Sequence, residues 1–102
     1  MTDNNKITIK QINYIKVLIR DLNAFMEKFQ QYPDIFQRYD TKLRSDIIEH
    51  YSGFHYNSPE KTYFIDSQNV KDNWSAKKSR AFISLLRRVL QSMSSDKRQF
   101  LG

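Results

Sequence analysis

The chain has 102 residues, no cysteine, two glycines and two prolines. Its length predicts one helical domain, residues 1–102, with residues 1–7 and 94–102 as flexible ends. The lack of cysteine excludes disulfides, thiolate zinc sites and cysteine nucleophiles, and so few glycines argue against a glycine-rich phosphate loop. No apolar run approaches the ~20 residues of a membrane span, and residues 1–6 are polar, so we expect a cytoplasmic protein.

Charge is unevenly distributed along the chain. The 17 basic and 11 acidic residues give a net charge of +6. Residues 75–102 hold seven of the basic residues and one of the acidic ones, so this segment carries a charge equal to the whole excess. This distribution predicts a localised basic element rather than a diffuse solubilising charge.

The first predicted helix covers residues 8–31. Thr8 and Gln11 have the spacing of a capping box, in which each side chain bonds the other residue's backbone N–H. Apolar residues then recur every three or four positions. They are Ile12, Ile15, Ile19, Leu22, Met26 and Phe29, widened by Leu18 and Phe25. We expect this stripe to form the core of a monomeric bundle, with a two-chain coiled-coil seam as the alternative.

A second helical region follows Pro33, which suits a first helical position. Its apolar residues recur every fourth position: Ile35, Tyr39, Leu43, Ile47 and Tyr51. Asp40 is able to cap a fresh start, so the pattern fits one bent helix or two short ones, and Gly53 supplies a left-handed stop.

Residues 54–74 are ambiguous. Ser58-Pro59-Glu60 resembles a helix start, whereas residues 61–65 resemble a short strand for which no second strong strand is evident. We therefore expect a short helix or ordered loop here, with residues 66–69 as loop. The last strong helix is predicted from near Ser75 to about Met93. The expected fold class is all-α, a compact bundle of three main helices plus one short element.

The last helix has two faces. Phe82, Ile83, Leu86, Val89, Leu90 and Met93 occupy one half of the helical wheel. Lys77, Arg80, Arg87 and Arg88 occupy the other half, with Ser84 and Gln91 between them, and Lys97 and Arg98 follow in a polar tail. Arginine and lysine neutralise phosphates, while serine and glutamine hydrogen-bond backbone or base edges. We therefore expect these eight residues to bind nucleic acid or another partner, although basic outer faces are also ordinary solvated surface.

Two segments have recognisable motifs. Residues 8–18 (TIKQINYIKVL) have the form T-x-K-Q-I-x-x-I-x-x-L, and residues 74–86 (WSAKKSRAFISLL) are similar to L-S-K-K-x-A-S-x-x-I-x-x-L. Together they resemble the opening and the closing of a small helical module of phage, plasmid and DNA-metabolism proteins from low-GC bacteria. Ala76 stands where the module has a lysine, Arg80 replaces a small residue, and the spacer is longer. The resemblance implies a setting beside helicase, nuclease or recombination domains.

The sequence favours a non-enzymatic mobile-element protein that binds DNA or RNA backbone or a nucleoprotein complex, as monomer or homodimer. One alternative is a stoichiometric inhibitor, of the anti-CRISPR or replication-blocking type, that docks on an acidic host protein. A second alternative is an immunity-type protein at the membrane surface, attached through the basic amphipathic helix. No small-molecule substrate is expected.

Other chemistry has little support in the sequence. Tyr56, Tyr63 and Trp74 belong to a cluster of aromatics that fits either a stacking patch for bases or a partner, or a small core. Asp46 and His50, one helical turn apart, fit an ordinary surface pair. We expect no catalytic residue, no metal site and no cofactor, because neither a triad nor a metal-ligand spacing is present.

Overall fold

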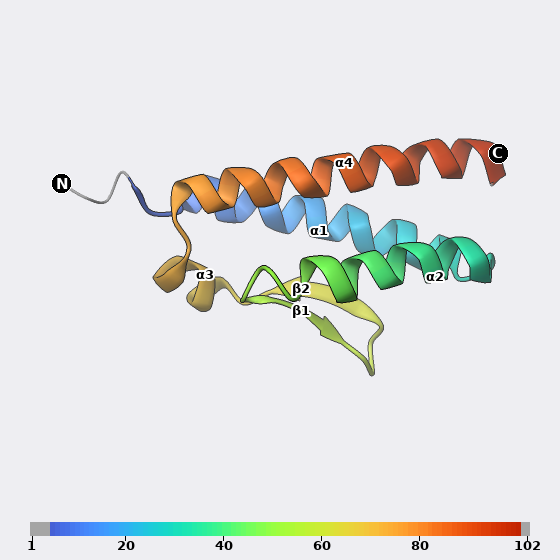
Figure 1. Cartoon of the computed structure of the whole chain (residues 1–102), viewed down its shortest axis with the longest axis horizontal. Coiled ribbons are helices and arrows are strands. Elements are labelled where there is room, and N and C mark those ends of the chain that lie inside the picture. Colours follow the sequence, from blue (N-terminus) through green and yellow to red (C-terminus); the bar gives the residue numbers. More distant parts are fainter. Residues whose placement is uncertain (1–4, 101–102) are drawn as a thin grey trace.

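The computed structural model describes residues 5–100 (Figure 1). Its elements in chain order are α1 (Ile9–Phe29), α2 (Pro33–Thr41), the π-helix η2 (Lys42–Ile47), β1 (Phe54–Asn57), β2 (Thr62–Ile65), α3 (Ser67–Asn73) and α4 (Ala76–Phe100). Helix α1 is central, because it contacts α4, α2 and β2. In Figure 1, α4 runs along one edge of the molecule, with the hairpin of β1 and β2 on the far side of α1.

The predicted capping box at the start of α1 is confirmed. The Gln11 N–H donates to Thr8 Oγ1 over 3.0 Å, and the Thr8 N–H donates to Gln11 Oε1 over 3.0 Å. The predicted apolar stripe is buried along its length, with Ile15, Leu22 and Phe29 fully buried. Burial within one chain leaves this stripe unavailable as a coiled-coil seam, so the bundle interpretation holds and the seam is wrong.

Helices α1 and α4 lie side by side and run in the same direction (Figure 1). At their N-terminal ends, the Ile7 N–H donates to the Trp74 carbonyl over 3.1 Å, and Gln11 Nε2 donates to the Ala76 carbonyl over 3.3 Å. At the other end, the Tyr32 hydroxyl donates to the Phe100 carbonyl over 3.3 Å. These bonds fix the relative register of the two long helices.

Residues 33–47 form one continuous helix whose second part is a π-helix. The Ile48 N–H donates to the Leu43 carbonyl, a bond that spans five residues. The predicted four-residue spacing is buried throughout, from Ile35 to Ile47. Gly53 has the expected positive φ of 103°, but it does not stop the helix, which ends at Ile47; it lies in the turn that leads into β1.

The expectation of a purely helical fold is wrong in one region. Strands β1 and β2 form a two-stranded antiparallel sheet, with Tyr56 opposite Tyr63. Ser58-Pro59-Glu60 belongs to the turn of this hairpin rather than to a helix, and Lys61 adopts a left-handed conformation with φ 56°. An isolated two-strand ribbon is unstable in water, but this one is stabilised by packing β2 against α1.

Two further boundaries differ from expectation. Residues 67–73, partly predicted as loop, form α3, because the Asp66 carboxylate caps the Asn69 N–H over 3.1 Å. Helix α4 continues past the predicted end at Met93 to Phe100, so residues 94–100 are helix and not a tail. At the N-terminal side, Ile7 is buried rather than free. The rest of the predicted flexible ends, residues 1–4 and 101–102, lies outside the described residues.

Candidate nucleic-acid interface

Helix α4 presents a polar, basic side to solvent. Its buried residues include Phe82, Leu86, Val89 and Met93, which pack in the core. Six of the predicted binding residues lie on the opposite side of the helix and are exposed. We call these six residues the basic face: Lys77, Arg80, Ser84, Arg87, Arg88 and Gln91.

The middle of the basic face is slightly hollowed. A shallow depression of about 320 Å³ is lined by Arg80, Ile83, Ser84, Arg87, Arg88 and Gln91. Ile83 is half-buried and is the one apolar residue of this lining, which otherwise consists of arginines, Ser84 and Gln91. The structure therefore gathers five of the six residues around one surface depression.

The cations of the basic face have no acidic partner within residues 5–100. The ion pairs in this part of the chain join Arg20 to Asp21, Arg38 to Asp96 and Arg44 to Asp40. The remaining cation near the start of α4, Lys78, lies over the rings of Trp74 and Tyr51, with its ammonium 5.4 Å and 5.8 Å from their centroids.

The single acidic residue of α4, Asp96, is occupied by groups of α2. The Arg38 guanidinium donates to Asp96 Oδ2 over 2.8 Å, and the Tyr39 hydroxyl donates to the same oxygen over 2.5 Å. Burial, and then the hydrogen bond to Asp96, raise the pKa of Tyr39 above its ordinary value. The carboxylate is thus turned toward α2, and it does not offset the positive charge on the opposite side of α4.

Arg38, Tyr39 and Asp96 are the residues that our sequence reasoning missed. The spacing of Tyr39 predicts a core residue, and its side chain is 4% exposed, but the spacing does not predict its hydrogen bond to Asp96. Nothing local to Asp96 indicates a partner 57 and 58 positions away. The one indication in the sequence is that Asp96 is the single acidic residue of α4, which sets it apart from the rest of that helix.

The two predicted binding residues beyond Gln91, Lys97 and Arg98, lie on different sides of α4. Arg98 is exposed and lies eleven residues, about three turns, after Arg87, so it continues the basic face toward the C-terminus. Lys97 is half-buried and lines a different depression, with Phe25 and Leu90 among its neighbours, between α1 and α4. The expectation that Lys97 extends the same path is therefore wrong.

The prediction that Tyr56, Tyr63 and Trp74 form an exposed aromatic patch is also wrong. Tyr63 and Trp74 are each 2% exposed, and Tyr56 is half-buried beneath the Arg44 guanidinium, which lies 3.9 Å from its ring centroid. The Trp74 indole N–H donates to the Ser52 carbonyl over 2.8 Å, and its ring packs on Phe82. These aromatics fill the core between short elements, the alternative that the sequence left open.

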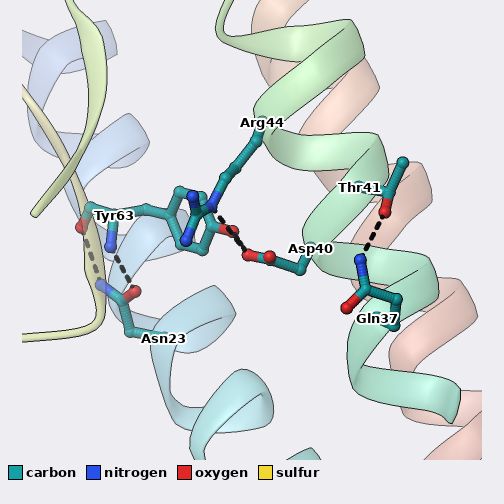
Figure 2. Close-up of polar contacts among 6 residues, drawn as sticks. All are labelled: Asn23, Gln37, Asp40, Thr41, Arg44 and Tyr63. Atoms are coloured by element: carbon teal, nitrogen blue, oxygen red, sulfur yellow. Dashed lines mark hydrogen bonds and ion pairs between the residues drawn. The ribbon is translucent and has the colours of Figure 1, made fainter. Parts of the chain in front are cut away.

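Beside β2 lies a polar cluster that positions the hairpin. Figure 2 shows the backbone of Tyr63 facing Asn23 of α1 and its ring reaching Asp40 and Arg44. Asn23 Nδ2 donates to the Tyr63 carbonyl over 2.8 Å, and the Tyr63 N–H donates to Asn23 Oδ1 over 2.7 Å. The Tyr63 hydroxyl donates to Asp40, which also pairs with Arg44 at 3.2 Å.

This cluster is internally satisfied. Burial, and then the hydrogen bond to Asp40, raise the pKa of Tyr63 far above its ordinary value, so its hydroxyl stays protonated. Each hydrogen-bonding group named above has a partner, which is the arrangement of a structural network rather than of a reactive site. We assign the cluster to holding the hairpin against α1 and α2.

Among the described residues, no group of three or more histidine, aspartate or glutamate side chains is placed to hold a metal ion. The predicted surface pair between Asp46 and His50 takes a different form. The His50 Nδ1 atom lies 2.6 Å from the backbone carbonyl of Asp46, so the ring contacts the main chain rather than the carboxylate. Within residues 5–100, no helix combines the length and apolarity needed to cross a membrane.

Comparison of the chain with protein-family models, curated proteins and solved structures finds no match. The resemblance of residues 8–18 and 74–86 to phage and plasmid modules therefore stays a prediction. The structure does place the two segments together, because the bonds from Ile7 to Trp74 and from Gln11 to Ala76 join their N-terminal ends.

Proposed function

We propose that this protein is a non-enzymatic nucleic-acid-binding protein whose basic face contacts the phosphate backbone. The observation that carries the proposal is the uncompensated charge of α4. Its outward side holds Lys77, Arg80, Arg87 and Arg88, and its one carboxylate, Asp96, is bonded to α2.

Phosphate binding is the chemistry that suits such a face. Each lysine or arginine that neutralises a phosphate releases a condensed counterion, so affinity falls steeply with salt. Four such contacts give a slope of log K against log salt of about −3.6 on duplex DNA. The resemblance to modules found beside helicases, nucleases and recombination domains supports the same assignment.

The test is fluorescence anisotropy with a labelled DNA across a salt series from about 50 to 200 mM. Arg87→Ala and Arg88→Ala should each weaken binding and make the salt slope shallower by about one unit. Lys42→Ala is the matched control, because Lys42 is an exposed cation on η2 that loses the same charge away from the basic face. Thermal unfolding should be nearly unchanged in all three variants, since these side chains lie outside the core.

Two results would overturn the proposal. One is an absence of DNA and RNA binding at about 50 mM salt, the condition that most favours phosphate contacts. The other is an equal effect of Lys42→Ala and Arg87→Ala, which would indicate diffuse attraction to a basic protein. In the first case the basic face becomes a candidate for docking on an acidic protein surface. Binding of the purified protein to vesicles with anionic lipid then separates protein docking from membrane attachment.

A further inference from the structure

The arrangement of side chains within the basic face indicates which kind of nucleic acid it fits. This inference rests on the proposed function. Ser84 and Gln91 are seven residues apart, so they lie almost in line along α4, about 10 Å from each other. Arg87 and Arg88 stand between them along the axis but are about 100° apart around it. One arginine therefore flanks the Ser84–Gln91 line on each side.

The other cations extend these two flanks. Arg80 and Arg98 precede and follow Arg87 by seven and eleven residues, close to whole numbers of turns, so they share its flank. Lys77 lies eleven residues before Arg88 and shares the opposite flank. The result is a central line of neutral hydrogen-bonding side chains between two rows of positive charge.

We infer that α4 lies in the major groove of duplex DNA. The groove is about 12 Å wide, and a helix with its side chains is about 10–12 Å across. In this placement the two rows of cations reach the phosphates of the two strands that border the groove. Ser84 and Gln91 face the base edges, where glutamine pairs with the N6 and N7 atoms of adenine.

The surroundings of α4 leave room for this docking. In Figure 1, α4 forms one edge of the molecule, and α1, α2 and the hairpin all lie on one side of it. The core residues of α4 point toward those elements, so the basic face points away from them. The shortest extent of the molecule, 19 Å, runs along the direction of view in Figure 1, so the body is narrow across α4.

Single strands and duplex RNA fit this face less well. Single-stranded recognition depends on exposed aromatic rings that stack on bases. In the described part of the chain, the exposed large apolar residues are Ile9, Tyr14, Val17, Phe64 and Phe100, none of which belongs to the basic face. The major groove of duplex RNA is deep and narrow, and a helix does not enter it.

The inference is tested with three probes of equal length and sequence: duplex DNA, one of its single strands, and duplex RNA. We expect duplex DNA to bind at least about tenfold more tightly than either of the others, because only its major groove admits a helix. Sequences selected by the wild type from a random duplex library should share a preferred base that Gln91→Ala no longer distinguishes. On that selected sequence, Gln91→Ala should lose roughly 5- to 150-fold in affinity.

The control is Gln37→Ala, which removes the same side chain from α2, where its amide donates to Thr41. It should leave both affinity and selected sequence unchanged. Equal binding of duplex DNA and duplex RNA would overturn groove entry and leave the proposed phosphate contacts standing. Unchanged sequence selection by Gln91→Ala would overturn the base contact, and an absence of binding to all three probes would overturn the proposed function as well.

Discussion

Replacing Asn23 with alanine should destabilise the protein by about 2–6 kcal/mol, although Asn23 is a polar residue on a helix. Its amide takes the place of a neighbouring strand for β2: it accepts from the Tyr63 N–H over 2.7 Å and donates to the Tyr63 carbonyl over 2.8 Å. Tyr63 is 2% exposed, so water reaches its backbone poorly. Each backbone group left without a partner costs about 1–3 kcal/mol.

The assay is urea unfolding followed by circular dichroism, with thermal unfolding as a second measure. A loss of about 2–6 kcal/mol corresponds to a decrease of roughly 10–40 °C in the melting temperature of a domain this size. Asn23→Asp is the sharper variant, because its carboxylate still accepts from the Tyr63 N–H but has no proton to donate to the carbonyl. It should be less stable than Asn23→Ala, because the carboxylate oxygen that replaces the amide nitrogen faces the Tyr63 carbonyl oxygen and repels it.

Asn13→Ala is the matched control, since Asn13 is an exposed asparagine of the same helix. It should change stability by no more than about 0.5 kcal/mol. Amide hydrogen exchange at Tyr63 gives an independent readout, and protection should fall in Asn23→Ala. The reasoning is refuted if Asn23→Ala and Asn13→Ala unfold alike and Tyr63 keeps its protection.

Three further outcomes are expected. Leu22→Ala, at a fully buried position, should cost about 2–5 kcal/mol through the cavity it leaves, measured by urea unfolding. Thr8→Ala should cost about 0.5–2 kcal/mol, because it removes the cap of α1, and no loss would mean that the helix begins elsewhere. Tyr39 and Tyr63 have raised pKa values, so their contribution to stability is present below the ordinary tyrosine pKa and decreases above it. The unfolding midpoint should therefore fall above pH ~10, and tyrosinate absorbance should show these two ionising only on unfolding.

The elements predicted well are those whose signal is local. Helix α1 carries its cap, its apolar stripe and its Tyr32-Pro33 end within one segment, and its observed bounds, Ile9–Phe29, differ from the predicted 8–31 by one residue at the start and two at the end. The two sides of α4 follow from the 100° step between residues, so the basic face was predicted without knowledge of any neighbour. Periodicity and caps are sufficient where a helix is long.

The elements that were missed, or left open as β2 was, depend on distant partners. Strand β1 has four residues, and β2 is completed by Asn23, forty positions earlier in the chain. The last two turns of α4 contain serines and charged residues that favour a tail, yet they are held by Tyr39 and Arg38 through Asp96. The burial of Trp74 and Tyr63 follows from the same short elements, and no spacing along the chain reveals it. The conformation of these segments is therefore determined by tertiary contacts, which outweigh the local sequence propensity.

The π-helix has a local signal in the sequence, the four-residue spacing, which fits one bent helix or two short ones but does not by itself indicate a π-helix. From Ile35 to Ile47 the buried residues are strictly four apart, and each such step overshoots a full α-helical turn by about 40°. The five-residue bond from Ile48 to Leu43 places one more residue in the turn, which returns Ile47 to the buried side. The π-helix is thus an α-helix that accommodates one extra residue.

This interpretation makes an unusual prediction about deletions. Removing Ser45, an exposed residue of η2, should restore an α-helix with Leu43 and Ile47 three positions apart, a spacing that keeps both on one face. Stability should remain within about 1 kcal/mol of wild type. Removing Arg20, an exposed residue in the middle of α1, should instead rotate Leu22 and its successors by about 100° and expose side chains worth about 1.5–3 kcal/mol each. Urea unfolding measures the stability of both deletion variants. Equal destabilisation would contradict the interpretation that η2 is an α-helix with one extra residue.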